Sequence, residues 1–207
     1  MYFSFKEINI WPEKEIIDTH MPADFKVKFP STRVILDATE VPIQKPSKVV
    51  AQSATWSSYK NQNTVKCMIG ITPKGVVSHI SKAYGGSASD RQIIESSDLL
   101  DNNKFEKKDS IMADRGIMVQ DLFASKNVQV NTPTTMRGKN QLEPETVVKD
   151  RRISSKRVHV ERVIGLAKTF KILKQQLSHQ KTKISGRIIY VCFVLVNFRP
   201  NIVSNFC

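Results

Sequence analysis

Residues 64–80 limit the fold most, because they predict two adjacent strands joined by a tight turn. The segment reads TVKCMIGITPKGVVSHI, with runs rich in β-branched residues on either side of Thr-Pro-Lys-Gly. Gly75 can take the positive φ that a short hairpin loop demands. The segment therefore predicts a sheet that contains an antiparallel hairpin.

The other segments alternate between strand and helix patterns. A strand begins in residues 33–43, where aliphatic and β-branched residues lead up to Asp37 and Pro42 ends the regularity. Further strands are predicted at 110–114 and 128–132, helices at 89–101, 116–127, 151–177 and 184–198, and loops at 83–89 and 133–150. The last helix has enough β-branched residues that a strand is an open alternative. This order predicts an α/β fold in which helices flank a mixed sheet.

The 207 residues suit one domain with a sizeable core. Residues 1–32, with three prolines, read as a helical or irregular lead-in, and residues 33–207 as the main domain. Three scattered cysteines (Cys67, Cys192 and Cys207) form no zinc-binding or disulfide pattern, which indicates reduced thiols in an intracellular protein. The most apolar run, residues 188–198, is shorter than the ~20 residues of a membrane span, so no membrane is expected.

The charge of the chain points to a polyanionic partner. The net charge is +13, and residues 137–187 hold 14 Lys and Arg against 4 Asp and Glu, a net of +10. Nucleic acid is the first partner for such a surface and an acidic membrane the second, while a merely solubilising face is the alternative. The candidate nucleic-acid contacts are Arg151, Arg152, Lys156, Arg157, Lys168, Lys171 and Lys174. The last three, spaced by three residues on the predicted helix, could follow a phosphate backbone or only solubilise that helix.

Two aspartates stand at the predicted ends of strands. Asp37 follows the first strand, and Asp114 follows the strand 110–114 in the stretch IMADRGIM. Either residue alone could be a turn residue or a helix cap. If the two strands are neighbours, however, their carboxyl ends meet at the edge where open sheets place ligands.

Glu161 lies on the predicted helix 151–177, between Arg157 and Lys168 on one face. An ordinary helical ion pair is one explanation. Gly165, one turn further on, costs about 1 kcal/mol against Ala in a helix interior, and it leaves room for a group to approach the carboxylate. Three converging carboxylates would repel one another, and divalent Mg²⁺ or Mn²⁺ would resolve that repulsion through hard oxygen ligands. Two such ions can activate water for in-line displacement at phosphorus.

Four segments of the chain resemble the catalytic domain of the DDE superfamily endonucleases, and most of all the Harbinger-like transposase-derived proteins of animal genomes. The segments are ILDATEVPI, TWSSYKNQNTVKCMIGITPKGVVSHISKAYGGSASDRQI, IMADRGIM and RVHVERVIGLAK, and the resemblance runs from about Trp11 to the C-terminus. It implies an RNase H-like fold over residues 33–207 and a catalytic Asp-Asp-Glu triad that binds two Mg²⁺ ions. The triad falls on Asp37, Asp114 and Glu161, with separations of 77 and 47 residues that suit this family.

The resemblance implies a metal-dependent DNA endonuclease, which cleaves a phosphodiester with water, leaves a 3′-hydroxyl and works in the nucleus. Ile117 stands where relatives commonly have an aromatic residue. Relatives also carry an N-terminal DNA-binding segment, so we expect a missing segment or a separate DNA-binding protein to supply targeting; a homo-oligomer is left open. The alternatives are a domesticated, non-catalytic DNA-binding or interaction module that keeps the fold, and the product of a pseudogene.

A few further residues carry weaker hypotheses. Asp90 is interpreted as a helix cap or an accessory site residue, His159 as structural and His79 as a surface residue. Trp56 and Tyr59 could stack on bases, although packing in the core is the expected use.

Overall fold

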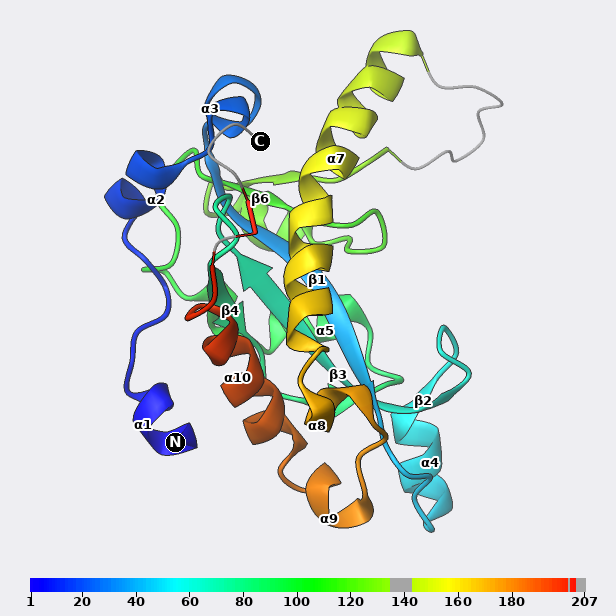
Figure 1. Cartoon of the computed structure of the whole chain (residues 1–207). Coiled ribbons are helices and arrows are strands. Elements are labelled where there is room, and N and C mark those ends of the chain that lie inside the picture. Colours follow the sequence, from blue (N-terminus) through cyan, green and yellow to red (C-terminus); the bar gives the residue numbers. More distant parts are fainter. Residues whose placement is uncertain (135–142, 201, 204–207) are drawn as a thin grey trace.

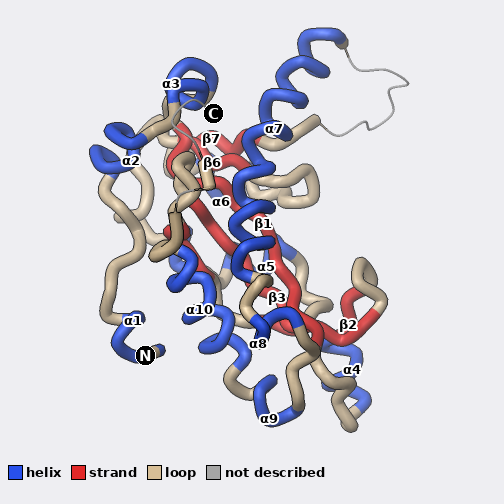
Figure 2. The backbone as a smooth tube through the Cα atoms, in the orientation of Figure 1, coloured by secondary structure: helices blue, strands red, loops and turns tan. Residues whose placement is uncertain are grey.

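The structure, a computed structural model, describes residues 1–134, 143–200 and 202–203. It contains one mixed sheet with helices on both faces (Figures 1 and 2). The strands are β1 (Thr32–Pro42), β2 (Trp56–Ser57), β3 (Gln62–Ile71), β4 (Val77–Ile80), β5 (Tyr84–Gly85), β6 (Ser110–Met112) and β7 (Gln129–Asn131). Their order is β2-β3-β1-β6-β7, and β4 and β5 also pair with β3. The predicted α/β class is confirmed, and the curled mixed sheet is consistent with an RNase H-like fold.

The helices lie before, between and after the strands. They are α1 (Tyr2–Lys6), α2 (Lys14–His20), α3 (Ala23–Lys28), α4 (Val49–Thr55), α5 (Asp90–Glu95), α6 (Gln120–Ala124), α7 (Pro144–Ala167), α8 (Lys171–Lys174), α9 (His179–Thr182) and α10 (Ser185–Val196), with a 3₁₀ turn at Asp98–Leu100. No helix in the described ranges is both long enough and apolar enough to span a membrane. Helix α7 crosses the face of the sheet over β1, with α10 beside it (Figure 1).

The predicted hairpin is confirmed as β3 and β4. These strands pair antiparallel, and Gly75 in their loop has a φ of 90°. The predicted neighbours also pair: β1 runs parallel to β6, with Ile35 opposite Met112. The expectation that β1 ends near Asp37 is wrong, because β1 continues to Pro42 along β3, with Asp37 opposite Ile69.

Side chains of β1 alternate between two hydrophobic cores, one on each face of the sheet. Ile35 packs into the core under α7 and α10, and Met112 of β6 packs there too. Val34 and Leu36 pack into the other core, which α5 and α6 cover. Because side chains alternate along a strand, Asp37 shares the face of Ile35 and so faces α7.

The predicted helix 151–177 differs from the helices observed. Helix α7 begins at Pro144, inside the predicted loop 133–150, because proline suits the first turn of a helix. It ends at Ala167, and the separate helix α8 follows. Leu177 instead forms two backbone hydrogen bonds with Pro42 and Gln44 beside β1, and this pairing draws the chain away from the helix axis. Residues 135–142 of the predicted loop lie outside the described residues.

Two other predicted helices are shorter than expected, and the alternative for the last one is settled. The segment 89–101 splits into α5 and the 3₁₀ turn, and Ser89 caps α5 in a capping box with Gln92. The segment 116–127 contains only α6, which is followed by Asn127 at a φ of 53°. The segment 184–198 is helical, as α10.

Candidate active site

Asp37, Asp114 and Glu161 line one cavity of about 630 Å³. The register explains how the first two meet: Asp37 and Asp114 each come two residues after the paired Ile35 and Met112. Because β6 ends at Met112 while β1 continues, the edge of β1 beyond this point has no β6 beside it. Glu161 comes from α7, which packs on the same face of β1. Three distant parts of the chain thus bring their carboxylates to one cavity.

The guanidinium of Arg157 connects two of these carboxylates. Its Nη1 lies 2.9 Å from Oδ1 of Asp114, and its Nη2 lies 3.9 Å from Oε1 of Glu161. Only 11% of the Arg157 side chain is exposed, against 49% for Asp114 and 56% for Glu161. The arginine therefore lies at the base of the cavity, with the two acids nearer to solvent.

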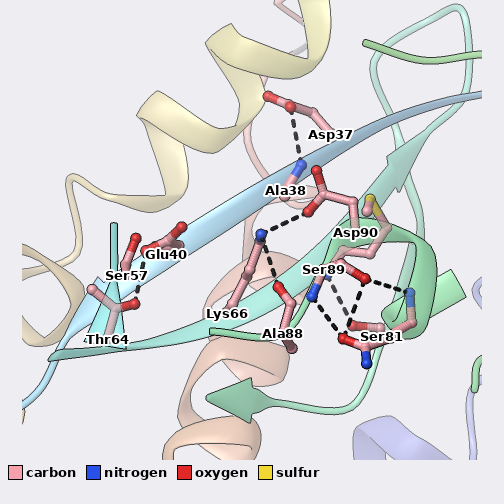
Figure 3. Close-up of polar contacts among 12 residues, drawn as sticks. Asp37, Ala38, Glu40, Ser57, Thr64, Lys66, Ser81, Ala88, Ser89 and Asp90 are labelled. Atoms are coloured by element: carbon pink, nitrogen blue, oxygen red, sulfur yellow. Dashed lines mark hydrogen bonds and ion pairs between the residues drawn. The ribbon is translucent and has the colours of Figure 1, made fainter. Parts of the chain in front are cut away.

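Asp37 is half-buried, and its carboxylate accepts a hydrogen bond of 2.9 Å from the backbone N–H of Ala38 (Figure 3). Burial raises the pKa of Asp37 to about 6, and the charges of Asp114 and Glu161 act in the same direction. The positive charge of Arg157 and the hydrogen bond from Ala38 oppose that rise in pKa. The site thus disfavours the ionised form of Asp37 in the absence of a further cation.

This raised pKa predicts how stability responds to Asp37→Asn in metal-free buffer. The folded pKa of about 6 exceeds the ordinary 3.8, so ionised Asp37 destabilises the wild type above about pH 6 and not below about pH 4. Asp37→Asn should raise the free energy of unfolding by up to about 3 kcal/mol near pH 8 and have no effect near pH 4. Urea denaturation in EDTA at both pH values measures this, with Asp101→Asn, an exposed acid elsewhere, as the control. A stabilisation that does not change with pH would contradict the prediction.

A lysine of β3 and the first residue of α5, an aspartate, also line the cavity. The Nζ of Lys66 lies 2.8 Å from Oδ1 of Asp90 and donates to the carbonyl of Ala88 at 3.2 Å (Figure 3). Ser89 is the helix cap, so of the two interpretations of Asp90 the cap is wrong, and its carboxylate lies in the cavity. Sequence reasoning missed Lys66, although a lysine within the apolar run of β3 was a signal for it.

The cavity also contains residues that the sequence analysis did not select for it. These are Ala38, Glu40, Lys60 and Ile164, together with Tyr59 and Lys168, which were considered for other roles. Glu40 accepts a hydrogen bond of 2.7 Å from the hydroxyl of Thr64. Burial and the nearby Lys60 lower the pKa of Lys168. Acidic and basic side chains therefore both line the cavity.

The structure separates the seven basic residues considered for nucleic-acid contact. Arg151 and Arg152 are exposed on α7, and Lys171 and Lys174 are exposed on α8. Lys168 is the C-cap of α7 and lines the cavity, as does Arg157. Because α7 ends before α8, the expected row of three lysines on one helix does not exist.

Lys156 is the clear correction among these basic residues. Its side chain is 8% exposed, its ammonium pairs with Asp24 of α3, and it lies 5.3 Å from the centre of the Phe25 ring. A lysine held in this way has no free surface to offer DNA. Lys156 instead helps to pack α3 against α7.

The structure also decides several weaker expectations. His79 is buried and not a surface residue: its Nδ1 lies 3.2 Å from the Asp98 carboxylate. His159 is buried against Phe25, and burial lowers its pKa to about 4, which fits the structural role. Trp56 and Tyr59 are 46% and 82% exposed, so core packing is wrong for both, and Tyr59 lines the cavity.

The residue types around the cavity fit a hard divalent cation, since carboxylate oxygens are the ligands that Mg²⁺ and Mn²⁺ prefer. Their arrangement is a separate matter. In the described ranges, no group of three or more His, Cys, Asp and Glu side chains is placed to hold a metal ion. A guanidinium, which is itself a cation, instead lies against two of the three carboxylates.

Comparison with known proteins identifies a family for this chain. A family model described as DDE superfamily endonuclease matches residues 36–197, which include all three carboxylates. Neither the curated proteins nor the solved structures gave a match.

Proposed function

The chain belongs to the DDE superfamily endonucleases, and from this premise we propose that it cleaves DNA at the cavity lined by Asp37, Asp114 and Glu161. The family supports a transposase-derived nuclease with DNA as its substrate. The proposal goes further and assigns a metal-dependent phosphodiester hydrolysis to this cavity. The observation that carries it is the meeting of three carboxylates, at the positions of the family motif, in one cavity. The Harbinger-like subgroup is part of the proposal.

In this proposal the three carboxylates would hold Mg²⁺ or Mn²⁺. When bound, such ions activate a water molecule and stabilise the leaving oxygen at phosphorus. The remaining residues of the cavity act on the DNA. Lys60 and Lys168 give it positive charge that can hold a phosphate, and exposed Tyr59 offers a face for a base. Glu161 lies on the exposed side of α7. One turn further on, Gly165 has no side chain, and nothing lies within 4 Å of a methyl group added there, so the helix surface beside Glu161 is open.

The test of this function is an assay of DNA cleavage with different metals. Incubation of the chain with supercoiled plasmid should give nicked product in Mg²⁺ or Mn²⁺, and none in EDTA. The new ends should carry 3′-hydroxyls, which a DNA polymerase can extend. Equal cleavage in EDTA, or ends that cannot be extended, would contradict the proposed mechanism.

We further propose that Arg151, Arg152, Lys171 and Lys174 hold the phosphate backbone with little sequence preference. From Arg151 to the end of α7 the helix covers about 24 Å at 1.5 Å per residue, so the two pairs can lie along one duplex. Such contacts release counterions and carry no sequence information.

Neutralising these four residues to Gln should lower the slope of log K against log salt by up to about 3.6, since each phosphate contact contributes about 0.9. All duplexes should be weakened alike. Binding titrations at several salt concentrations measure the slope, with Lys107→Gln/Lys108→Gln, two exposed lysines before β6, as the control. An unchanged slope, or a loss confined to one sequence, would contradict this assignment.

One observation favours a second candidate function. Arg157 already pairs with Asp114 and Glu161, and the described residues contain no group of three or more His, Cys, Asp and Glu side chains placed to hold a metal ion. A non-catalytic DNA-binding or interaction protein that keeps the fold would have this property. Such a protein would bind DNA in the salt titration and leave the plasmid intact in every metal. For either function we propose a nuclear location and a separate DNA-binding protein that supplies targeting, with a homo-oligomer left open.

A further inference from the structure

Arg157 has two kinds of contact with the carboxylates of the cavity. Its pair with Glu161 is the ordinary one between residues four apart on a helix, and it is long, at 3.9 Å. Its pair with Asp114 is shorter, at 2.9 Å, and joins α7 to the end of β6. The shorter contact is therefore with the residue that is distant in sequence, so the guanidinium spans the gap between two separate elements.

The positive charge of Arg157 interacts with the carboxylates of Asp114, Glu161 and Asp37. Besides its two direct contacts, it is the strongest influence that favours ionised Asp37. A single buried guanidinium thus takes the position of positive charge among three acids, and the proposed function assigns the same position to a divalent cation.

Arg157 is also incompletely satisfied where it lies. Its Nε is buried and has no hydrogen-bond partner among the described residues. A buried donor without a partner costs free energy, so other positions of the guanidinium can compete with this one. Lys60 and Lys168 line the same cavity, and a phosphate held there would offer the guanidinium a bidentate partner.

We propose that Arg157 is a positioning residue that competes with metal: its guanidinium must leave Asp114 and Glu161 before a divalent cation binds them, and a DNA phosphate then accepts it. This inference rests on the proposed function, since it assumes that these carboxylates bind metal. The competition explains why three acids that line one cavity are not placed to hold a metal ion. It also makes metal and DNA binding support each other, because each removes an obstacle to the other.

The inference is tested by metal binding and needs no cleavage. Arg157→Met keeps most of the aliphatic stem and removes the charge. Calorimetric titration with Mn²⁺ should give Arg157→Met a dissociation constant lower than that of the wild type by about tenfold or more. The reason is that the variant lacks the positive charge beside the two metal ligands Asp114 and Glu161. Arg157→Lys, which keeps the charge but loses the fork, should fall between the two. Arg162→Met is the matched control: Arg162 is exposed, is next to Glu161 and does not line the cavity, so it should bind Mn²⁺ as the wild type does.

Coupling to DNA supplies a second readout, which requires only the wild type if a variant fails to fold. In Ca²⁺, used to limit cleavage, a saturating duplex should tighten metal binding by the wild type severalfold, and should do so less for Arg157→Met. Circular dichroism shows which variants are folded.

The outcomes separate this inference from the function on which it rests. If the wild type and Arg157→Met bind Mn²⁺ equally while Asp114→Asn loses it, the competition is refuted and the metal site stands. If the wild type lacks coupling between DNA and metal, the second half of the inference is refuted. If the folded wild type and folded Arg157→Met both fail to bind Mn²⁺, the proposed metal site itself is refuted.

Discussion

Asp114→Asn should nearly abolish DNA cleavage in Mg²⁺ and Mn²⁺ while the protein remains folded. The amide keeps the shape of the side chain and removes the charge that would hold a cation. A unit charge about 4 Å from another is worth about 4 kcal/mol at the effective dielectric of a partly exposed site. Since each 1.36 kcal/mol is a factor of ten in rate, we expect cleavage to fall by about a thousandfold. Plasmid nicking with purified wild type and variant measures the loss.

Two comparisons make this result specific. Asp101→Asn removes an exposed carboxylate that does not line the cavity, and it should cleave as the wild type does. DNA binding by Asp114→Asn should persist or tighten, because a negative charge near the phosphate is lost. Cleavage by Asp114→Asn at the wild-type rate would remove the cavity as the active site.

Gly85→Ala should strongly destabilise the fold. A Cβ at Gly85 would lie 2.0 Å from the carbonyl oxygen of Ala54 and 2.9 Å from its carbonyl carbon. Both atoms belong to the backbone of α4, so β5 or α4 must move. Overpacking of this kind costs about 1–3 kcal/mol or more, and at the upper end the melting temperature should fall by about 6–12 °C for a chain of this size. Thermal unfolding followed by circular dichroism measures the shift.

The matched control is Gly165→Ala on α7, where an added methyl group meets nothing within 4 Å. Alanine is favoured over glycine in a helix interior by about 1 kcal/mol, so this variant should be more stable. If Gly85→Ala had the same melting temperature as the wild type, the close approach of β5 to α4 would be wrong. If the melting temperature of Gly85→Ala falls, DNA cleavage should fall as well, because Tyr84 of β5 pairs with Lys66 of the cavity.

Local patterns predicted the elements that depend on neighbours in sequence. The hairpin formed by β3 and β4 follows from two β-branched runs and Gly75, and α10 follows from its apolar residues. The adjacency of β1 and β6 was predicted only as a condition, and their pairing through Ile35 and Met112 fulfils it. The hairpin and α10 could be predicted because local residues carry most of the information that determines them.

Other features depend on contacts between distant residues, which a single sequence does not reveal. The break between α7 and α8 accompanies the backbone pairing of Leu177 beside β1. The burial of Lys156 depends on Asp24, from a segment that the sequence analysis treated as a lead-in. Likewise, the place of Lys66 in the cavity depends on Asp90. In each case a charged or apolar residue has the expected type, and its distant partner decides its role.

The roles of Asp37, Asp114 and Glu161 came from the family resemblance, and they remain predictions. What the structure adds is their common cavity and the guanidinium of Arg157 between two of them. That arginine was selected from the sequence only as one of several bases in a positively charged segment. The distance between β6 and α7 along the chain hid its contact with Asp114.

The proposed metal site is tested by locating Mn²⁺ in crystals of the chain soaked at a concentration that supports cleavage. Anomalous scattering from manganese identifies the ion without assumptions about its ligands. We expect a manganese peak in the cavity, in contact with carboxylate oxygens of Asp37 and Asp114, with Arg157 turned away from Asp114. A cavity without manganese in crystals of cleavage-competent protein, or manganese bound only elsewhere, would contradict it.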